Sequence, residues 1–224
     1  MSFVNGTDFL ADAISQDHKR AYDGDKGPNT GGMGAYSPVP QIGQDVVDTA
    51  IETIVKPTVQ AMSDEGTPFT GILYAGLIAT ADGPKVIEFN ARFGDPETEV
   101  VLPKLTSDLG AGISALLNGE TPEFTWDNDN ATLGVVLAAD GYPVDVIKGA
   151  AIPEIPVDED SHVYYAGVAR SEEGLVANSG RVLLVETSAA DIKAAQDKVY
   201  AIIDQLDTKG MFYRHDIGAK ALNI

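Results

Sequence analysis

The sequence predicts an α+β protein, and two features of the chain carry that prediction. Strand-like segments cluster with only a few helical ones, in both halves of the chain. Two strand-like segments at residues 70–90 are separated by Ala81-Asp82-Gly83-Pro84, whose Asp-Gly dipeptide is typical of a hairpin turn. We therefore expect antiparallel sheets with a few helices packed against them.

The first half should contain a short strand, a long loop, two helical segments and the hairpin. Met1–Val4 resembles the end of a strand whose beginning is absent, which hints at truncation. Residues 16–40 are rich in Gly and Pro, which indicates a loop. Apolar residues at three-to-four spacing predict a helix over 44–65, kinked or divided at Pro57. A second helical pattern covers 97–117 and is interrupted near a proline.

The second half is richer in strands. Residues 133–139 form an apolar run typical of a buried strand. Further elements are expected as strands at 163–170, 174–177 and 181–185, a helix at 189–206, and a tail at 211–217 that runs back into the fold. The polar stretch 118–130 marks the expected boundary between a domain at 1–120 and a domain at 121–224.

The composition excludes several classes of protein. The 34 Asp and Glu residues outnumber the 15 Lys and Arg residues, and the net charge of −19 argues against nucleic-acid or membrane partners. The absence of Cys excludes a disulfide framework and a cysteine nucleophile. No stretch approaches the ~18–20 apolar residues of a membrane span, and the first residues lack the pattern of a signal peptide. We therefore expect a cytoplasmic protein.

Glu88 and Asn90 form the first candidate site. Side chains alternate along a strand, so these two residues should share one face with Val86, while Ile87 and Phe89 face the other side. A carboxylate and an amide oxygen on one face suit a hard divalent cation such as magnesium, which also takes substrate phosphates as ligands. On spacing alone, a polar sheet face in water is the commoner interpretation.

Two polar residues follow this pair. Arg92 has no obvious acidic partner, and its planar fork suits a phosphate or a carboxylate. Asp95 precedes Pro96 and Glu97, a pattern typical of a helix start with Asp as the cap. Asp95 is thus as readily a helix cap as a substrate contact. Together, Arg92 and a helix N-terminus would suit an anion.

The third candidate site lies within residues 16–34. Three cationic residues and a histidine form a local positive island there: Lys19, Arg20, Lys26 and His18. Neighbouring glycines would let backbone N–H groups approach an anion closely. No Walker A or dinucleotide-binding glycine pattern is present, and composition alone also fits a flexible surface loop.

Other chemistries find no support in the sequence. The three histidines are too far apart along the chain to form a metal-binding pair on one helix: His18, His162 and His215. No serine lies in the Gly-x-Ser-x-Gly context of a serine hydrolase. The candidate chemistry therefore rests on the three segments above.

Taken together, these segments resemble one enzyme family. QDHKRAYDGDKGPNTGGMGAYSP (16–38), GILYAGL (71–77) and KVIEFNARFGDPETEVVLP (85–103) are similar to phosphoribosylamine–glycine ligases, and GMFYRHDIGAKAL (210–222) is similar to that family's C-terminal end. The resemblance covers most of the chain. It implies the C-terminal part of an ATP-grasp domain, an antiparallel sheet with helices, followed by a small strand-rich C-terminal domain of the kind found in biotin carboxylase.

The resemblance also implies a reaction. These ligases join glycine to 5-phosphoribosylamine through glycyl phosphate, with ATP as co-substrate and Mg²⁺ or Mn²⁺ on its phosphates, to give glycinamide ribonucleotide in purine synthesis. Glu88 and Asn90 match the family's metal-ligand positions, which now favours the metal site over a solvated face. Arg92 is the expected catalytic residue, near the phosphoryl acceptor.

The same resemblance implies a substrate side. The expected substrate-binding residues are Asp17, Lys19, Arg20, Gly31, Gly32, Gly34 and Asp95. Which of them contact glycine and which contact phosphoribosylamine stays open. Charge complementarity alone favours Asp17 for the ammonium group of glycine.

The chain departs from the family in one respect. The family's chains are considerably longer at the N-terminus, where they carry a domain that helps to bind phosphoribosylamine and lysines that hold the nucleotide phosphates. We therefore expect a C-terminal fragment or a split subunit that is inactive without the missing N-terminal part. The alternatives are another ATP-grasp carboxylate–amine ligase and a non-catalytic module derived from one.

Overall fold

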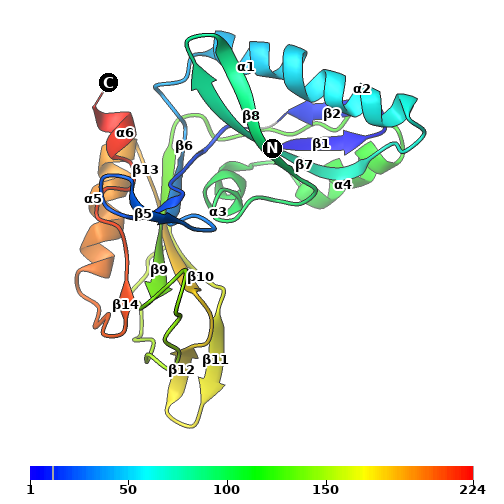
Figure 1. The fold of residues 1–224 in the computed structure, drawn as a ribbon. Helices are drawn as coiled ribbons and strands as arrows, with labels where there is room; N and C mark the ends of the chain where they lie inside the picture. The colour runs from blue at the N-terminus through cyan, green and yellow to red at the C-terminus, as the bar shows by residue number, and fades with distance from the viewer. Residues whose placement is uncertain (12, 224) are drawn as a thin grey trace. The chain divides into compact units, whose positions relative to one another are not determined.

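The computed structural model describes residues 1–11 and 13–223, and the chain forms two compact units (Figure 1). Unit 1 consists of Met1–Ile14, Pro40–Gly94 and Leu105–Asp127. Unit 2 consists of Ser15–Val39, Asp95–Lys104 and Asn128–Ile224. Each unit contains antiparallel sheets with few helices, so the α+β prediction is confirmed. The domain boundary near residue 120 stays a prediction. Unit 2 also includes Ser15–Val39 and Asp95–Lys104, which precede that boundary in the chain.

Unit 1 is built on a four-stranded antiparallel sheet in the order β2-β1-β7-β8. The strands are β1 (Ser2–Asn5), β2 (Asp8–Ala11), β7 (Thr70–Thr80) and β8 (Gly83–Asn90). The predicted hairpin over 70–90 is thus confirmed. Gly83 has a φ of 91°, a left-handed conformation that lets the chain reverse directly after Asp82.

Side chains of β1 are buried on both faces of this sheet, because neighbouring side chains of a strand point to opposite sides. Val4 packs in a buried cluster with Val59 and Leu73. Phe3 is 2 % exposed and lies against the ring of Phe124, with the ring centroids 4.7 Å apart. The amide of Asn5 also donates to the Leu116 carbonyl at 2.9 Å, which joins β1 to the helix α4 (Leu109–Leu117).

The helix predicted over 44–65 is confirmed, with a change of helix type in the middle. It consists of α1 (Gln44–Ala50), a π-helical segment η1 (Ile51–Val55) and α2 (Lys56–Asp64). Pro57 lies in the first turn of α2, where a proline is tolerated. The helix is divided by the π-helical segment η1, which ends just before α2, rather than kinked at the proline. In Figure 1 these segments run alongside the sheet of unit 1.

Unit 2 contains a larger antiparallel sheet in the order β10-β13-β9-β6-β3, with β14 also paired to β9. Its strands are β3 (Gln16–Asp17), β6 (Gly34–Ser37), β9 (Ala131–Ala139), β10 (Ser161–Tyr165), β13 (Arg181–Ala189) and β14 (Met211–Phe212). Two hairpins accompany it: β4 (Arg20–Tyr22) with β5 (Lys26–Asn29), and β11 (Val168–Ser171) with β12 (Gly174–Ala177).

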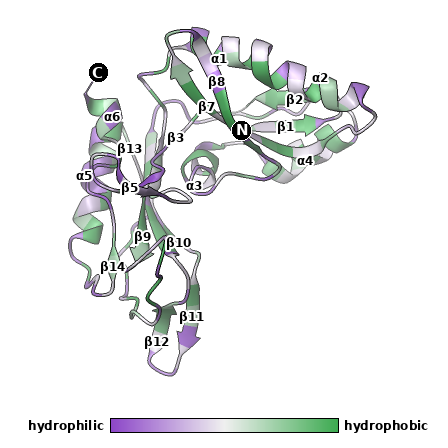
Figure 2. Cartoon of the chain, in the orientation of Figure 1, coloured by the Kyte–Doolittle hydropathy of each residue, from purple (hydrophilic) through white to green (hydrophobic). Residues whose placement is uncertain are grey.

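The core of unit 2 surrounds β9, which is buried along its whole length. Figure 2 colours most of this strand as hydrophobic. Helix α5 (Ile192–Ile203) packs against β9 and β13, and the short helix α3 (Thr98–Val101) packs against β6 and β9. Cover on both faces explains why β9 reads as a continuous apolar run. A short C-terminal helix α6 (Ala219–Leu222) also contacts α5.

The loop predicted over 16–40 is wrong, because this region supplies four strands. Strand β6 pairs with both β3 and β9, and all of its residues are buried. Gly34 is needed in β6 for a packing reason: a Cβ atom there would lie 2.5 Å from the Gly134 carbonyl oxygen. Glycines that indicated a loop thus permit the close approach of neighbouring strands.

Two other predicted elements are divided in the structure. The strand predicted over 163–170 is split into β10 and β11, because the chain turns at Gly167, where a Cβ atom would lie 2.5 Å from the Arg181 carbonyl oxygen. The helical pattern over 97–117 becomes α3, a 3₁₀ turn η2 (Leu102–Lys104) and α4. No helix in the described part of the chain is long and apolar enough to span a bilayer.

Candidate functional site

Glu88 and Asn90 lie at the end of β8 in unit 1. In the hairpin register, Glu88 pairs with Gly76 and Asn90 pairs with Tyr74, without a bulge between them, so the two side chains share one face. The predicted shared face with Val86 is wrong. Val86 pairs with Leu77, so a bulge at the intervening residue turns Val86 and Glu88 to opposite sides.

Gly76 and Arg92 are the neighbours of this pair. A Cβ atom on Gly76 would lie 3.1 Å from the Cγ atom of Glu88, so the absence of a side chain there makes space for the carboxylate arm. The amide oxygen of Asn90 accepts a hydrogen bond from the Nη2 atom of Arg92 at 3.4 Å. The Nη1 atom of Arg92 donates to the Phe93 carbonyl at 2.8 Å. The amide oxygen of Asn90 therefore lies beside a guanidinium group.

The donor set fits a hard divalent cation. A carboxylate and an amide oxygen are ligands of Mg²⁺ and Mn²⁺, with phosphate oxygens and water completing the shell. No group of three or more His, Cys, Asp or Glu residues suited to a metal comes together within residues 1–11 and 13–223. An ion at Glu88 and Asn90 would thus depend on a phosphate-bearing substrate for its other ligands.

Asp17 is the centre of the candidate site in unit 2. Its side chain is 7 % exposed, and its Oδ2 atom lies 2.6 Å from the Nζ atom of Lys19. Its Oδ1 atom accepts a hydrogen bond from the His18 N–H at 2.6 Å. The same Nζ atom of Lys19 lies 4.0 Å from Oε1 of Glu97, whose side chain is 4 % exposed. Burial, and then the charge of Glu97, raise the pKa of Asp17 to about 6 against the opposing effect of Lys19.

The turn formed by Gly31 and Gly32 passes directly beside Asp17. Gly32 has a φ of 124°, and a Cβ atom there would lie 2.6 Å from the Oδ1 atom of Asp17 and 2.4 Å from the ring of Pro96. No larger residue fits at this position without a shift of the backbone or of Asp17. The glycine turn thus sets the distance between Asp17 and Pro96.

Asp95 is held by Arg181 of β13. The Nη1 atom of Arg181 lies 2.8 Å from Oδ1 of Asp95 and donates to the carbonyl oxygens of Asp95 at 2.7 Å and Gly31 at 3.3 Å. The interpretation of Asp95 as a helix cap is wrong, because α3 begins at Thr98 with Glu97 as its N-cap residue. Asp95 instead joins the glycine turn to the main sheet of unit 2.

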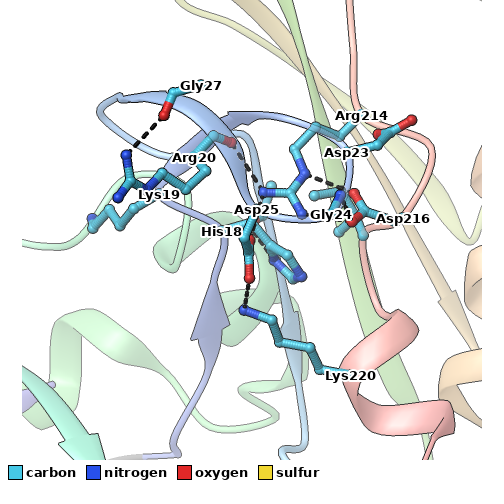
Figure 3. Close-up of polar contacts among 12 residues, drawn as sticks. His18, Lys19, Arg20, Asp23, Gly24, Asp25, Gly27, Arg214, Asp216 and Lys220 are labelled. Carbon is cyan, nitrogen blue, oxygen red and sulfur yellow. Dashed lines mark hydrogen bonds and ion pairs between the residues drawn. The ribbon is translucent and has the colours of Figure 1, made fainter.

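The C-terminal segment fixes the β4–β5 hairpin through Arg214 (Figure 3). The Arg214 side chain is 1 % exposed, and its Nε and Nη2 atoms donate to the two carboxylate oxygens of Asp216, both at 2.7 Å. Its Nη1 atom donates to Asp25 at 2.9 Å and to the Arg20 carbonyl at 3.0 Å. Lys220 approaches the other oxygen of Asp25 at 2.7 Å. Burial opposes the ionisation of Asp216, but the hydrogen bonds from Arg214 outweigh it and lower the pKa of Asp216 to about 2.

His18 is buried, and its surroundings favour the neutral form of the ring. Its Nδ1 atom lies 3.2 Å from the Gly34 carbonyl oxygen, and because a carbonyl only accepts, Nδ1 carries the proton. Burial, and then the charges of Arg214 and Lys220, lower the pKa of His18 to about 4. The expected positive island is therefore wrong for His18, and Lys19 in the same segment is matched by carboxylates.

The structure separates the predicted site residues by unit. Unit 1 holds Glu88, Asn90 and Arg92, and unit 2 holds Asp17, Lys19, Arg20, Gly31, Gly32, Gly34 and Asp95. Within unit 2, Asp17, Lys19 and Gly32 come together. The guanidinium group of Arg20 instead donates to the Gly27 carbonyl at 2.7 Å, and Gly34 is a buried sheet residue.

Sequence reasoning missed four residues of this region: Glu97, Glu99, Arg181 and Arg214. Burial first, and then the charge of Asp95, raise the pKa of Glu99 to about 7, and its Oε2 atom is buried without a hydrogen-bond partner among the described residues. In the sequence, Glu97 belongs to the pattern of a helix start. Its buried position in the structure is what marks it as part of this region. No local signal marks Arg181, whose partner Asp95 lies 86 residues away in the chain.

Comparison with protein families identifies two adjacent domains of one family. The ATP-grasp (A) domain of phosphoribosylglycinamide synthetase matches residues 1–98, and the C domain of the same synthetase matches residues 132–220. The phosphoribosylamine–glycine ligase of Streptococcus pyogenes serotype M18 is 56 % identical over 223 residues, which is 99 % of this chain and 53 % of that protein. That of Lactococcus lactis is 54 % identical with the same coverage. The chain thus spans about half the length of these relatives.

Solved structures give the same result. The phosphoribosylamine–glycine ligase of Thermotoga maritima matches with a TM-score of 0.85 and 36 % identity, over 96 % of this chain and 54 % of that one. The biotin carboxylase domain of a thermophilic 2-oxoglutarate carboxylase matches with a TM-score of 0.64 and 13 % identity, over 94 % of this chain and 45 % of that one, which shows the fold alone. The resemblance read from the sequence is confirmed: the chain belongs to the phosphoribosylglycinamide synthetase family.

Proposed function

We propose that this chain is part of an ATP-dependent ligase that joins the carboxyl group of glycine to the amine of 5-phosphoribosylamine, giving glycinamide ribonucleotide in cytoplasmic purine synthesis. The observation that carries the proposal is 56 % identity to a curated ligase along 99 % of the chain. The oxygen pair of unit 1 and the buried carboxylates of unit 2 support it. Since the relatives are about twice as long, the complete activity requires a further N-terminal part.

Glu88 and Asn90 are the proposed ligands for Mg²⁺ or Mn²⁺. When bound, such an ion neutralises charge on the phosphates of ATP. Arg92 is the proposed catalytic residue, because its guanidinium group lies beside the amide oxygen of Asn90 and suits an oxygen of the transferring phosphoryl group. Preorganised positive charge at that oxygen lowers the barrier to phosphoryl transfer.

The substrates are proposed to meet unit 2. Asp17 is the candidate for the ammonium group of glycine, and the backbone of Gly31 and Gly32 for a substrate anion. Lys19, Arg20, Gly34 and Asp95 stay proposals as direct substrate contacts. The contacts that Gly34 makes with His18 and Asp95 makes with Arg181 support a positioning role for both.

A mixing experiment tests the proposal. The 224-residue chain and the N-terminal half of the Streptococcus pyogenes ligase are purified separately, mixed, and assayed for ADP release that requires both glycine and phosphoribosylamine. We expect release only from the mixture, and a loss of at least about 100-fold when Glu88 is replaced by Gln together with Asn90 by Ala. A matched surface variant, Lys193→Met, should keep full release, because Lys193 pairs with Asp197 on the exposed side of α5.

The outcomes separate the alternatives. If ADP release requires a different carboxylic acid instead of glycine, or a different amine instead of phosphoribosylamine, the chain belongs to a different ATP-grasp ligase. A mixture that forms a stable complex but releases no ADP would indicate a non-catalytic module. Either result would contradict the proposal.

A further inference from the structure

An ammonium group already lies between two buried carboxylates in unit 2. The Nζ atom of Lys19 is 2.6 Å from Oδ2 of Asp17 and 4.0 Å from Oε1 of Glu97. The side chains of Asp17 and Glu97 are only 7 % and 4 % exposed, whereas that of Lys19 is 43 % exposed. The side chain of Lys19 therefore extends from solvent to the two buried carboxylates.

Such a site recognises a primary ammonium group by charge and by hydrogen bonding. We propose that Asp17 and Glu97 form the binding site for the ammonium group of glycine, and that Lys19 is an internal occupant that glycine displaces. This inference rests on the proposed function, and it adds Glu97 as a specificity residue and Lys19 as a competitor. The flexible four-carbon stem of Lys19 allows its ammonium group to leave toward solvent.

The chemistry of the two amines favours glycine over phosphoribosylamine at this site. The amine of phosphoribosylamine must lose its proton before it can attack the acyl group, and a pair of carboxylates stabilises the protonated form instead. The amine of glycine must stay inert, since a free amine could attack a second activated glycine. Holding it as an ammonium between Asp17 and Glu97 prevents that side reaction.

Binding to the 224-residue chain tests the displacement. Chemical shifts of the amides around Asp17 and Gly32 are followed by NMR during titration with glycine, with methylammonium, which keeps only the ammonium group, and with acetate, which keeps only the carboxylate. We expect Lys19→Met to bind glycine and methylammonium about fivefold more tightly than the unsubstituted chain, since the internal competitor is gone. Acetate binding should not improve. Glu97→Gln should weaken binding of both amines about tenfold.

The controls keep the result interpretable. Lys193→Met removes an exposed lysine of the same unit from a different ion pair and should leave binding of both amines unchanged. Circular dichroism and amide spectra show whether each variant is folded, and Lys19→Gln serves as a second variant if Lys19→Met is not. Weaker or unchanged binding of amines by a folded Lys19 variant, or no amine binding at all, would overturn the inference.

A kinetic arm separates this inference from the proposed function. In the mixture with the N-terminal half, Lys19→Met should lower the KM for glycine and leave the KM for phosphoribosylamine unchanged. If the unsubstituted mixture ligates glycine but the KM for glycine does not fall in this variant, the displacement is wrong and the proposed function stands. If the unsubstituted mixture does not ligate glycine, the proposed function fails, whatever the chain binds.

Discussion

Replacing Arg214 by Met should destabilise unit 2 strongly. The side chain is buried and makes four charge-assisted or backbone contacts, two to Asp216, one to Asp25 and one to the Arg20 carbonyl. Methionine fills much of the space but removes the guanidinium partner of the Asp216 carboxylate, which keeps the hydrogen bond from the Gly24 N–H at 2.8 Å. Removing one member of a buried ion pair costs about 3–5 kcal/mol.

The exposed fractions of the two carboxylates refine this magnitude. Asp216 is 28 % exposed and Asp25 is 39 % exposed, so both can recover some hydration, and Asp25 keeps its ion pair with Lys220. We therefore expect a loss of about 3 kcal/mol, at the lower end of the range. In a chain of this size that loss corresponds to a fall in Tm of roughly 6–12 °C.

Urea and thermal unfolding of the 224-residue chain, followed by circular dichroism, measure this loss. Lys220→Met is the matched variant, since it removes only the more exposed pair with Asp25 and should cost less than about 1 kcal/mol. Asp216→Asn added to Arg214→Met should recover part of the stability, because no buried charge is then left alone. A loss below about 1 kcal/mol for Arg214→Met would refute the reasoning.

Three further predictions follow from the site geometry. Gly76→Ala should weaken Mn²⁺ binding in the presence of ATP about tenfold, measured by the paramagnetic resonance of free Mn²⁺, because the added methyl group crowds Glu88; unchanged affinity would argue against Glu88 as a ligand. Gly32→Ala should cost at least about 2 kcal/mol in urea unfolding, since it combines a φ of 124° with a Cβ atom 2.4 Å from Pro96. The folded pKa of Glu99, about 7, lies above its ordinary 4.5, so its contribution to stability is present below pH 4.5 and is lost as the pH rises through 7. Glu99→Gln should flatten that decline in unfolding experiments, and an unaltered pH profile would contradict the burial of this carboxylate.

Local chemistry made part of the fold predictable. The 70–90 hairpin depends on an Asp-Gly turn between two strand-like runs, and both features are adjacent in sequence. The apolar run at 133–139 is a strand because β9 is covered on both faces. The two candidate sites could be proposed because their residues occur in long strings similar to one family.

What the sequence could not predict depends on distant partners. The strand β6 looked like a glycine-rich loop because its pairing partner β9 lies about 100 residues later in the chain. Arg181 carries no local sign of its role, since Asp95 approaches it only in the folded chain. Arg214 has a local partner in Asp216, but its contact with Asp25 likewise forms only in the folded chain. The bulge that turns Val86 away from Glu88 likewise arises from the register of the hairpin rather than from alternation.

The ion at Glu88 and Asn90 is the central claim of the proposed function, and broadening of amide signals by Mn²⁺ tests it most directly. In the presence of ATP and the N-terminal half, Mn²⁺ should broaden the signals at the end of β8 first, and the broadening should disappear when Glu88 is replaced by Gln together with Asn90 by Ala. Signals at the end of β8 that stay sharp while Mn²⁺ and ATP bind elsewhere would contradict the account.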